Sequence, residues 1–138
     1  MHKNFYASGF LYHPSSQQIL LQQNDSSWIL FGGPYLDKEN PEVLFKNKIF
    51  EVLNIEIKTV RCVYSYLDEN TDEFQYIVYS KLSKFKKFSS KNGTTFAWFS
   101  FRDLQKLKIS EQTKHDIVVG QRVIEAAERK SRGEHTFQ

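Results

Sequence analysis

The sequence contains little cysteine, glycine or proline, and each shortage excludes a class of protein. Its 138 residues include one cysteine, Cys62, with six glycines and three prolines. One thiol cannot form an internal disulfide, which excludes a disulfide-stapled secreted domain and a cysteine-based structural zinc site. We expect Cys62 to be a small buried residue of a strand. The scarcity of glycine and proline excludes collagen-like and low-complexity architectures.

Long hydrophobic runs are also absent. The chain has no stretch of about 18 apolar residues, so we expect no membrane-spanning helix and no membrane partner. The N-terminus lacks the basic, apolar and small-residue succession of a signal peptide. We therefore expect a cytoplasmic protein.

What the sequence does contain suits a globular domain. Hydrophobic residues make up 40%, charged residues 25% and aromatic residues 15% of the chain, which is enough for a core and for a ring-lined pocket. The net charge of +3 would help a polyphosphate to approach, but it does not by itself indicate a nucleic-acid partner. We expect one domain over residues 1–131 and a frayed tail over 132–138. Oligomeric state is left open.

Hydrophobic patterns predict strands, a helix, further strands and a second helix. The expected strands are 5–13, 18–22, 28–31, 60–67, 74–82 and 95–101. Asn40 is a good N-cap for a helix over 41–53, and Asn54 is a plausible left-handed stop. A final helix is expected over 111–131, capped by Ser110. This order predicts an α+β fold with a mixed sheet between helices.

The pair Gly32-Gly33 interrupts the pattern after the strand at 28–31. Adjacent glycines at a strand end indicate an unusual backbone angle or a close approach by another group. We expect these two glycines to form a turn.

The segment around this pair resembles the Nudix hydrolase family, whose box reads G-x5-E-x7-R-E-U-x-E-E-x-G-U, where U is a bulky aliphatic residue. With Gly33 as the first glycine, Glu39 falls on the first glutamate and Glu51 on one of the paired glutamates, while Ile49 and Ile55 match the aliphatic positions. The box is degenerate, because four positions differ: Asn47, Lys48, Val52 and Asn54 replace the arginine, two glutamates and the second glycine. The later run Trp98-Phe99-Ser100-Phe101-Arg102-Asp103-Leu104 resembles the family's W-V-S-x-x-E-L strand.

The resemblance implies a Nudix-like sheet between helices and a diphosphate (pyrophosphate) hydrolase. Such enzymes cleave a nucleoside diphosphate linked to another group, with water attacking phosphorus and helix glutamates holding Mg²⁺ or Mn²⁺. On this basis Glu51 is the candidate catalytic residue and metal ligand, supported by the Gly33 carbonyl and by Glu39. The candidate substrate-binding residues are Lys48 for phosphate, and Trp28 and Tyr35 for stacking on a base.

The metal site implied by the resemblance has lost most of its charge. Positions 48, 51 and 52 share one helix face, and here they are Lys48, Glu51 and Val52, so one carboxylate remains. Opposite unit charges about 4 Å apart interact by roughly 4 kcal/mol at an effective dielectric near 20. Since about 1.4 kcal/mol is tenfold in affinity, tight metal binding should be lost and hydrolysis should be weak or absent. Acids on loops would have to rebuild the site, and the candidates are Asp37, Asp68, Glu69, Asp72 and Glu73.

Two alternatives remain open. In the first, the chain is an inactive nucleotide or phosphate sensor in which Lys48 contacts phosphate; the simpler interpretation of Lys48 is an exposed ion pair with Glu51. In the second, it is an interaction or RNA-binding module. Lysines interleave with Phe85 and Phe88 over residues 81–91, although a solvated loop explains that pattern more simply. The expected partner is a small nucleotide or diphosphate-containing ligand, and nucleic acid is not expected.

Overall fold

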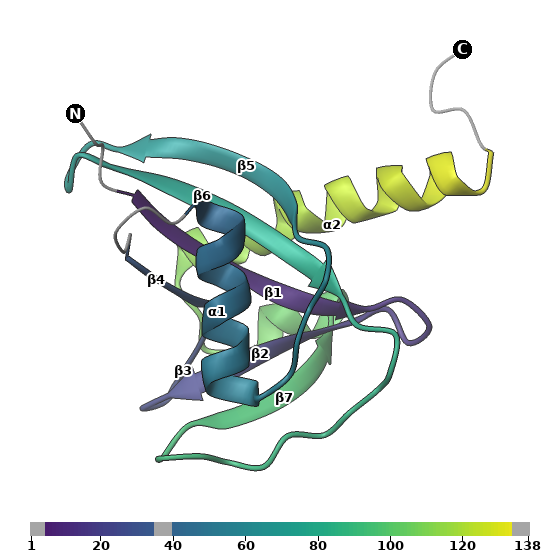
Figure 1. The fold of residues 1–138 in the computed structure, drawn as a ribbon, viewed down its shortest axis with the longest axis horizontal. Helices are drawn as coiled ribbons and strands as arrows, with labels where there is room; N and C mark the ends of the chain where they lie inside the picture. The colour runs from purple at the N-terminus through teal and green to yellow at the C-terminus, as the bar shows by residue number, and fades with distance from the viewer. Residues whose placement is uncertain (1–4, 35–39, 134–138) are drawn as a thin grey trace.

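The computed structural model describes residues 5–34 and 40–133 of the chain. A seven-stranded sheet forms the centre, and Figure 1 shows helix α1 across one of its faces and helix α2 along the other. The elements are β1 (Phe5–His13), β2 (Gln18–Asn24), β3 (Ser27–Ile29), β4 (Phe31–Pro34), α1 (Pro41–Leu53), β5 (Arg61–Asp68), β6 (Glu73–Lys81), β7 (Thr95–Ser100), the short 3₁₀ helix η1 (Phe101–Lys106) and α2 (Glu111–Ser131).

The sheet is mixed, as the sequence predicts. Its strand order is β3-β2-β1-β6-β5, with β4 paired to β1 and β7 paired to β2. Strands β1 and β6 run parallel from Phe5↔Phe74 to Tyr12↔Lys81, and the other pairs are antiparallel. In the described part of the chain, no helix has the length and apolarity needed to cross a membrane.

Both long helices begin at their predicted N-caps, and α1 also ends at its predicted stop. The Asn40 side chain accepts a hydrogen bond from the Val43 amide at 2.8 Å, and Asn54 ends α1 in the left-handed conformation with φ 59°. The Ser110 hydroxyl caps α2 by accepting from the Thr113 amide at 3.1 Å. These local signals place α1 and α2 at the predicted residues.

The two faces of the sheet carry separate cores because side chains alternate along each strand. On the α2 face, Phe10 and Tyr12 of β1 pack with Ile117 and Ile124. On the α1 face, Leu11 packs with other buried residues, among them Phe31, Phe45 and Ile49. Each helix therefore covers its own hydrophobic layer.

The predicted turn at the double glycine is wrong. Gly32 and Gly33 lie inside β4, where they pair with Ser8 and Ala7 of β1. A Cβ atom on Gly32 would lie 2.2 Å from the Ala7 carbonyl oxygen, which no real structure tolerates. Close approach of two backbones, rather than an unusual angle, is therefore the reason for glycine at position 32.

The expected burial of Cys62 is also wrong. Cys62 is exposed, because β5 is an edge strand and its pairing with β6 shifts between Cys62 and Tyr64. A bulge of this kind changes the face to which the preceding side chains point. Apolar pattern alone does not reveal such a shift.

Replacing Gly32 by alanine should destabilise the fold by about 3 kcal/mol or more, because the added methyl meets backbone that cannot move aside. Gly33→Ala is the matched control, since no described heavy atom lies within 4 Å of a Cβ placed there, and its effect should stay within about 0.5 kcal/mol. Urea unfolding measures both. Equal stability of the two variants would contradict the close spacing of β1 and β4.

Candidate functional site

The second half of helix α1 borders a small pocket where the expected metal-binding face lies. The pocket measures about 220 Å³, and we call it the α1 pocket. It is lined by Gln22, Glu51, Val52, Lys91, Asn92, Thr94 and Phe96. Val52 also packs against the α1-side core, which agrees with its place on the apolar stripe of the helix.

Glu51 lies between two lysines. Its carboxylate Oε1 is 3.6 Å from the Nζ of Lys48, one helical turn away, and the Nζ of Lys91 donates to its main-chain carbonyl at 3.4 Å. The Glu51 side chain is 73% exposed and that of Lys48 is 32% exposed. The charge balance beside this helix face is therefore positive.

The described residues at this face do not fit a divalent metal ion. Mg²⁺ and Mn²⁺ prefer about six oxygen ligands, with carboxylates prominent among them. Within residues 5–34 and 40–133, no three His, Cys, Asp or Glu side chains gather closely enough to hold an ion. Glu51 instead has ammonium groups as neighbours, and those groups repel a cation.

The predicted site residues after the double glycine lie outside the described part of the chain, whereas Gly33 lies within it. Tyr35, Asp37 and Glu39 lie outside the described residues. Gly33 is buried within β4.

A second pocket opens on the α2 face of the sheet. It measures about 360 Å³, and we call it the α2 pocket. Its lining includes Tyr6 and Ser8 of β1, Leu30, Tyr66 and Asp68 of β5, Gln75 and Ile77 of β6, and Gln112 and Asp116 of α2. Hydroxyl, amide and carboxyl groups converge there beside aromatic rings, a combination that suits a polar ring system.

A buried carboxyl group anchors the α2 pocket. Asp116 is 4% exposed and accepts hydrogen bonds from the Tyr64 hydroxyl and from the Gln112 amide at 2.9 Å. Burial raises the pKa of Asp116 above its usual range, and the two hydrogen bonds oppose that rise. The Tyr64 ring stacks on Tyr66 with centroids 5.5 Å apart, which fixes the wall of the pocket.

One hydrogen bond links a lining residue of each pocket. Gln22 lines the α1 pocket, Leu30 lines the α2 pocket, and the Gln22 side-chain amide donates to the Leu30 carbonyl at 3.0 Å. This bond connects β2, at the α1 pocket, to the residue between β3 and β4 that lines the α2 pocket.

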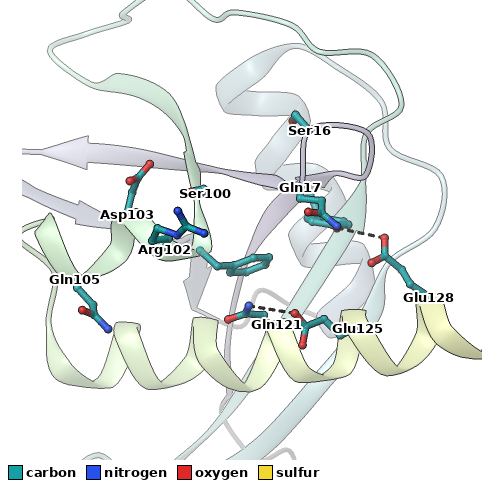
Figure 2. A pocket seen from close by; sticks show the side chains of 11 residues that line it. Ser16, Gln17, Ser100, Arg102, Asp103, Gln105, Gln121, Glu125 and Glu128 are labelled. Atoms are coloured by element: carbon teal, nitrogen blue, oxygen red, sulfur yellow. Dashed lines mark hydrogen bonds between the residues drawn. The ribbon is translucent and has the colours of Figure 1, made fainter. Parts of the chain in front are cut away.

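A larger pocket of about 650 Å³ lies between α2, η1 and the β1–β2 turn, and its charge is of the wrong sign for phosphate. Figure 2 shows Glu125 and Glu128 of α2 opposite Arg102 and Asp103. Glu128 accepts from the Tyr12 hydroxyl and Glu125 from the Gln121 amide, each at 3.2 Å. Burial and the Glu128 carboxylate raise the pKa of Tyr12 to about 12. Three carboxylates against one guanidinium disfavour an anion here.

Aromatic rings that could stack on a base lie in different places, and of the predicted pair only Trp28 is among the described residues. Trp28 packs its indole edge-on against Phe99, with centroids 4.7 Å apart, at the margin of the α2-side core. Tyr66, in contrast, lines the α2 pocket. Stacking on a base by any of these rings stays a prediction.

Sequence reasoning missed Lys91 and Asp116. Lys91 is 40 residues from Glu51, in a segment interpreted as a solvated loop, so only the fold brings the two together. Asp116 had a detectable signal, because it adjoins Ile117 on the stripe that continues through Gly120 and Ile124. A carboxylate beside such a stripe indicates a buried polar contact.

Stability of the Asp116→Asn variant should rise relative to the natural protein as pH increases. A raised folded pKa means that the folded state holds the Asp116 proton more tightly than the unfolded chain, and this contribution is full below the ordinary aspartate pKa and is lost as pH rises through the folded value. Asparagine does not titrate. Urea unfolding of both proteins in steps from acid to neutral pH measures the difference, and a difference that stayed constant throughout would contradict the buried state of this carboxyl.

Comparison with known proteins identifies relatives by structure only. No family model matches the sequence, and no curated protein is similar to it. Among solved structures, a MutT from a study of the fish pathogen Aliivibrio salmonicida and Vibrio cholerae has a TM-score of 0.69 and 16% identity, covering 88% of this chain and 96% of that one. The solution structure of the E. coli ORF135 protein has a TM-score of 0.67 and 17% identity, covering 91% and 94%.

A hydrolase of the NUDIX family from Clostridium perfringens gives a TM-score of 0.66 at 16% identity, covering 88% of this chain and 96% of its own. At such identities the likeness establishes the architecture, and the α+β class predicted from the sequence is confirmed. The chain has the fold of the Nudix hydrolases, with a mixed sheet packed between helices.

Proposed function

We propose that this protein binds a nucleotide or another diphosphate-containing small molecule across the α1 and α2 pockets, and that Nudix-type hydrolysis of this ligand is weak or lost. The observation that carries the proposal is the position of Glu51 between Lys48 and Lys91. Two amines beside the former metal face supply the positive charge that Mg²⁺ or Mn²⁺ would supply in an active relative. The diphosphate is then held by fixed cations.

Lys48 is available for such a contact because its present partner holds it weakly. An exposed ion pair between side chains one helical turn apart contributes less than about 1 kcal/mol. A diphosphate carries more negative charge than one carboxylate and offers several oxygens to an ammonium group with three donors. The ligand therefore competes well with Glu51 for the Lys48 amine.

The α2 pocket supports a nucleoside at the other end of the ligand. Its volume of about 360 Å³ lies within the usual range for small-molecule sites. Tyr66 offers a ring face, while Gln112 and Asp116 offer hydrogen-bonding groups close together. These groups suit the polar edge of a base.

Hydrolysis is the second candidate function, and the Nudix fold is the observation that favours it. Stabilising the negative charge that develops during attack on phosphorus is usually the largest catalytic term. Here the lysines can supply part of this stabilisation, and Glu51 is the carboxylate at hand for the attacking water. We expect turnover far below that of a Nudix enzyme with intact glutamates.

Ligand binding should not require a metal, and it should depend on Lys48. ADP-ribose is a suitable probe, and its thermal shift should persist in EDTA. Lys48→Ala should weaken binding by about tenfold or more, because it removes a charge-assisted contact. Lys46→Ala is the matched control, since position 46 lies two residues away on another face of α1. A shift that appears only with Mg²⁺ or Mn²⁺ would refute the proposal.

Restoring the two lost glutamates should restore metal affinity. The double variant Lys48→Glu with Val52→Glu places three carboxylates on the face that now has one, so Mn²⁺ affinity measured by calorimetry should rise at least tenfold. The control is Lys46→Glu with Phe50→Glu, which changes the charge equally at i, i+4 positions elsewhere on α1. If both variants gained equally, position on the helix would not matter and the assignment of this face would fail.

A further inference from the structure

Positive charge is concentrated in one stretch of the chain. Between Glu73 and Asp103 there is no acidic residue, while the stretch contains Lys81, Lys84, Lys86, Lys87, Lys91 and Arg102. Because the whole chain carries +3, the other residues together carry −3. All five of these lysines are exposed. Such a strip attracts a polyanion rather than a single phosphate.

Fixed contacts hold this strip on the sheet. The Trp98 indole donates to the Lys86 carbonyl at 2.7 Å, and the Leu82 amide donates to the Tyr12 carbonyl at 2.8 Å. The Phe88 ring meets Phe96 edge-on with centroids 6.5 Å apart. Figure 1 shows the middle of the strip, residues 82–94, as the long connection from β6 to β7. The segment is solvated, as the sequence interpretation has it, and these contacts hold parts of it against the sheet.

Aromatic rings form a groove beside the lysines. The groove measures about 300 Å³ and its lining includes Phe85, Phe88, Trp98 and Lys87. The Phe85 ring lies 5.2 Å from that of Trp98 and 5.1 Å from that of His13, yet 47% of Phe85 is exposed. A large ring that is held by neighbours and still open to solvent can stack on another ring.

We propose that this groove binds single-stranded nucleic acid. A base stacks on Phe85 beside Trp98, and the phosphates on either side of it contact lysines of the strip. The combination of a cationic track and aromatic platforms is the general means by which proteins hold single strands without reading their sequence. The groove shares Phe96 with the α1 pocket, and Lys91 at the end of the strip lines that pocket, so we assign the phosphate contacts to the lysines from position 81 to position 87. The proposal does not depend on the function proposed for the α1 and α2 pockets.

The chemistry favours a strand over the other anionic ligands. A strand offers several successive phosphates to the lysines from position 81 to position 87, whereas a mononucleotide offers phosphate at one end only. A duplex keeps its base faces stacked inside the helix, where Phe85 cannot reach them. An anionic membrane would use the lysines, but it would leave the stacking geometry without a purpose.

The test is fluorescence anisotropy with a labelled 12-nucleotide oligouridylate at several salt concentrations. Phe85→Ala should weaken binding by about tenfold, since stacking on one base accounts for a change of that order. Phe85→Leu keeps the hydrophobic volume without a stacking plane and should show the same loss. Phe50→Ala is the matched control, because Phe50 is 51% exposed on α1 and distant in the sequence, and it should bind normally.

Lysine substitutions test the contribution of the strip's positive charge to oligonucleotide affinity. Lys86→Ala with Lys87→Ala should reduce the slope of log affinity against log salt by about 1.4, following the usual 0.7 per phosphate contact of a single strand. Lys58→Ala with Lys130→Ala removes the same charge elsewhere and should leave the slope unchanged.

Four outcomes of the binding measurements would overturn the proposal, and a fifth comes from a variant of the α1 pocket. They are absence of oligonucleotide binding, equal affinity for a duplex, equal losses in the control variants, and binding to anionic vesicles in place of the oligonucleotide. A loss caused by Lys48→Ala would instead place the strand in the α1 pocket and would also overturn it. ADP-ribose at saturation should not displace the oligonucleotide, which keeps this test distinct from that of the proposed function.

Discussion

The close packing of β1 against its neighbours is the constraint on which the rest of the structure depends. Cβ atoms on Gly9 and Gly32 would lie 2.0 and 2.2 Å from backbone oxygens of β6 and β1, so the three strands meet at a spacing that only glycine permits. This contact sets the register of β1, which in turn directs Phe10 to one core and Leu11 to the other. The positions of both pockets depend on this register. Strand β1 lines the α2 pocket, and β4 precedes helix α1, which lines the α1 pocket.

Electrostatics then divides the surface into regions of different chemistry. Lysines flank Glu51 and line the segment between β6 and β7, whereas carboxylates gather around the pocket between α2 and η1. The α1 face and the groove beside Phe85 are therefore the regions whose charge favours an anion. Because of this separation of charge, the volume of a pocket does not indicate where an anion binds. The pocket of about 650 Å³ between α2 and η1 is more spacious than the α1 and α2 pockets, but its charge repels phosphate.

Local sequence signals predict much of this fold, whereas features that depend on contacts between distant residues are not predicted from the sequence. Asn40 and Asn54 define α1 through contacts within a few residues, so sequence reasoning finds both ends of the helix. Gly32 was misinterpreted because the backbone that requires a glycine belongs to a strand more than 20 residues earlier. Lys91 was missed for the same reason, since its neighbour Glu51 is adjacent only in the folded chain. Asp116 is the exception, because its place beside an apolar stripe was visible.

The lysines beside Glu51 have a consequence for ligand choice under cellular conditions. Triphosphates circulate mainly as complexes in which magnesium already covers part of their charge, and a cleft formed by ammonium groups gains little from such a neutralised partner. Under the proposed function, it would gain most from diphosphates that are not bound to magnesium, such as sugar-linked diphosphates. If the protein binds diphosphates as proposed, a lysine at position 48 in place of a glutamate would make its occupancy independent of fluctuations in free magnesium.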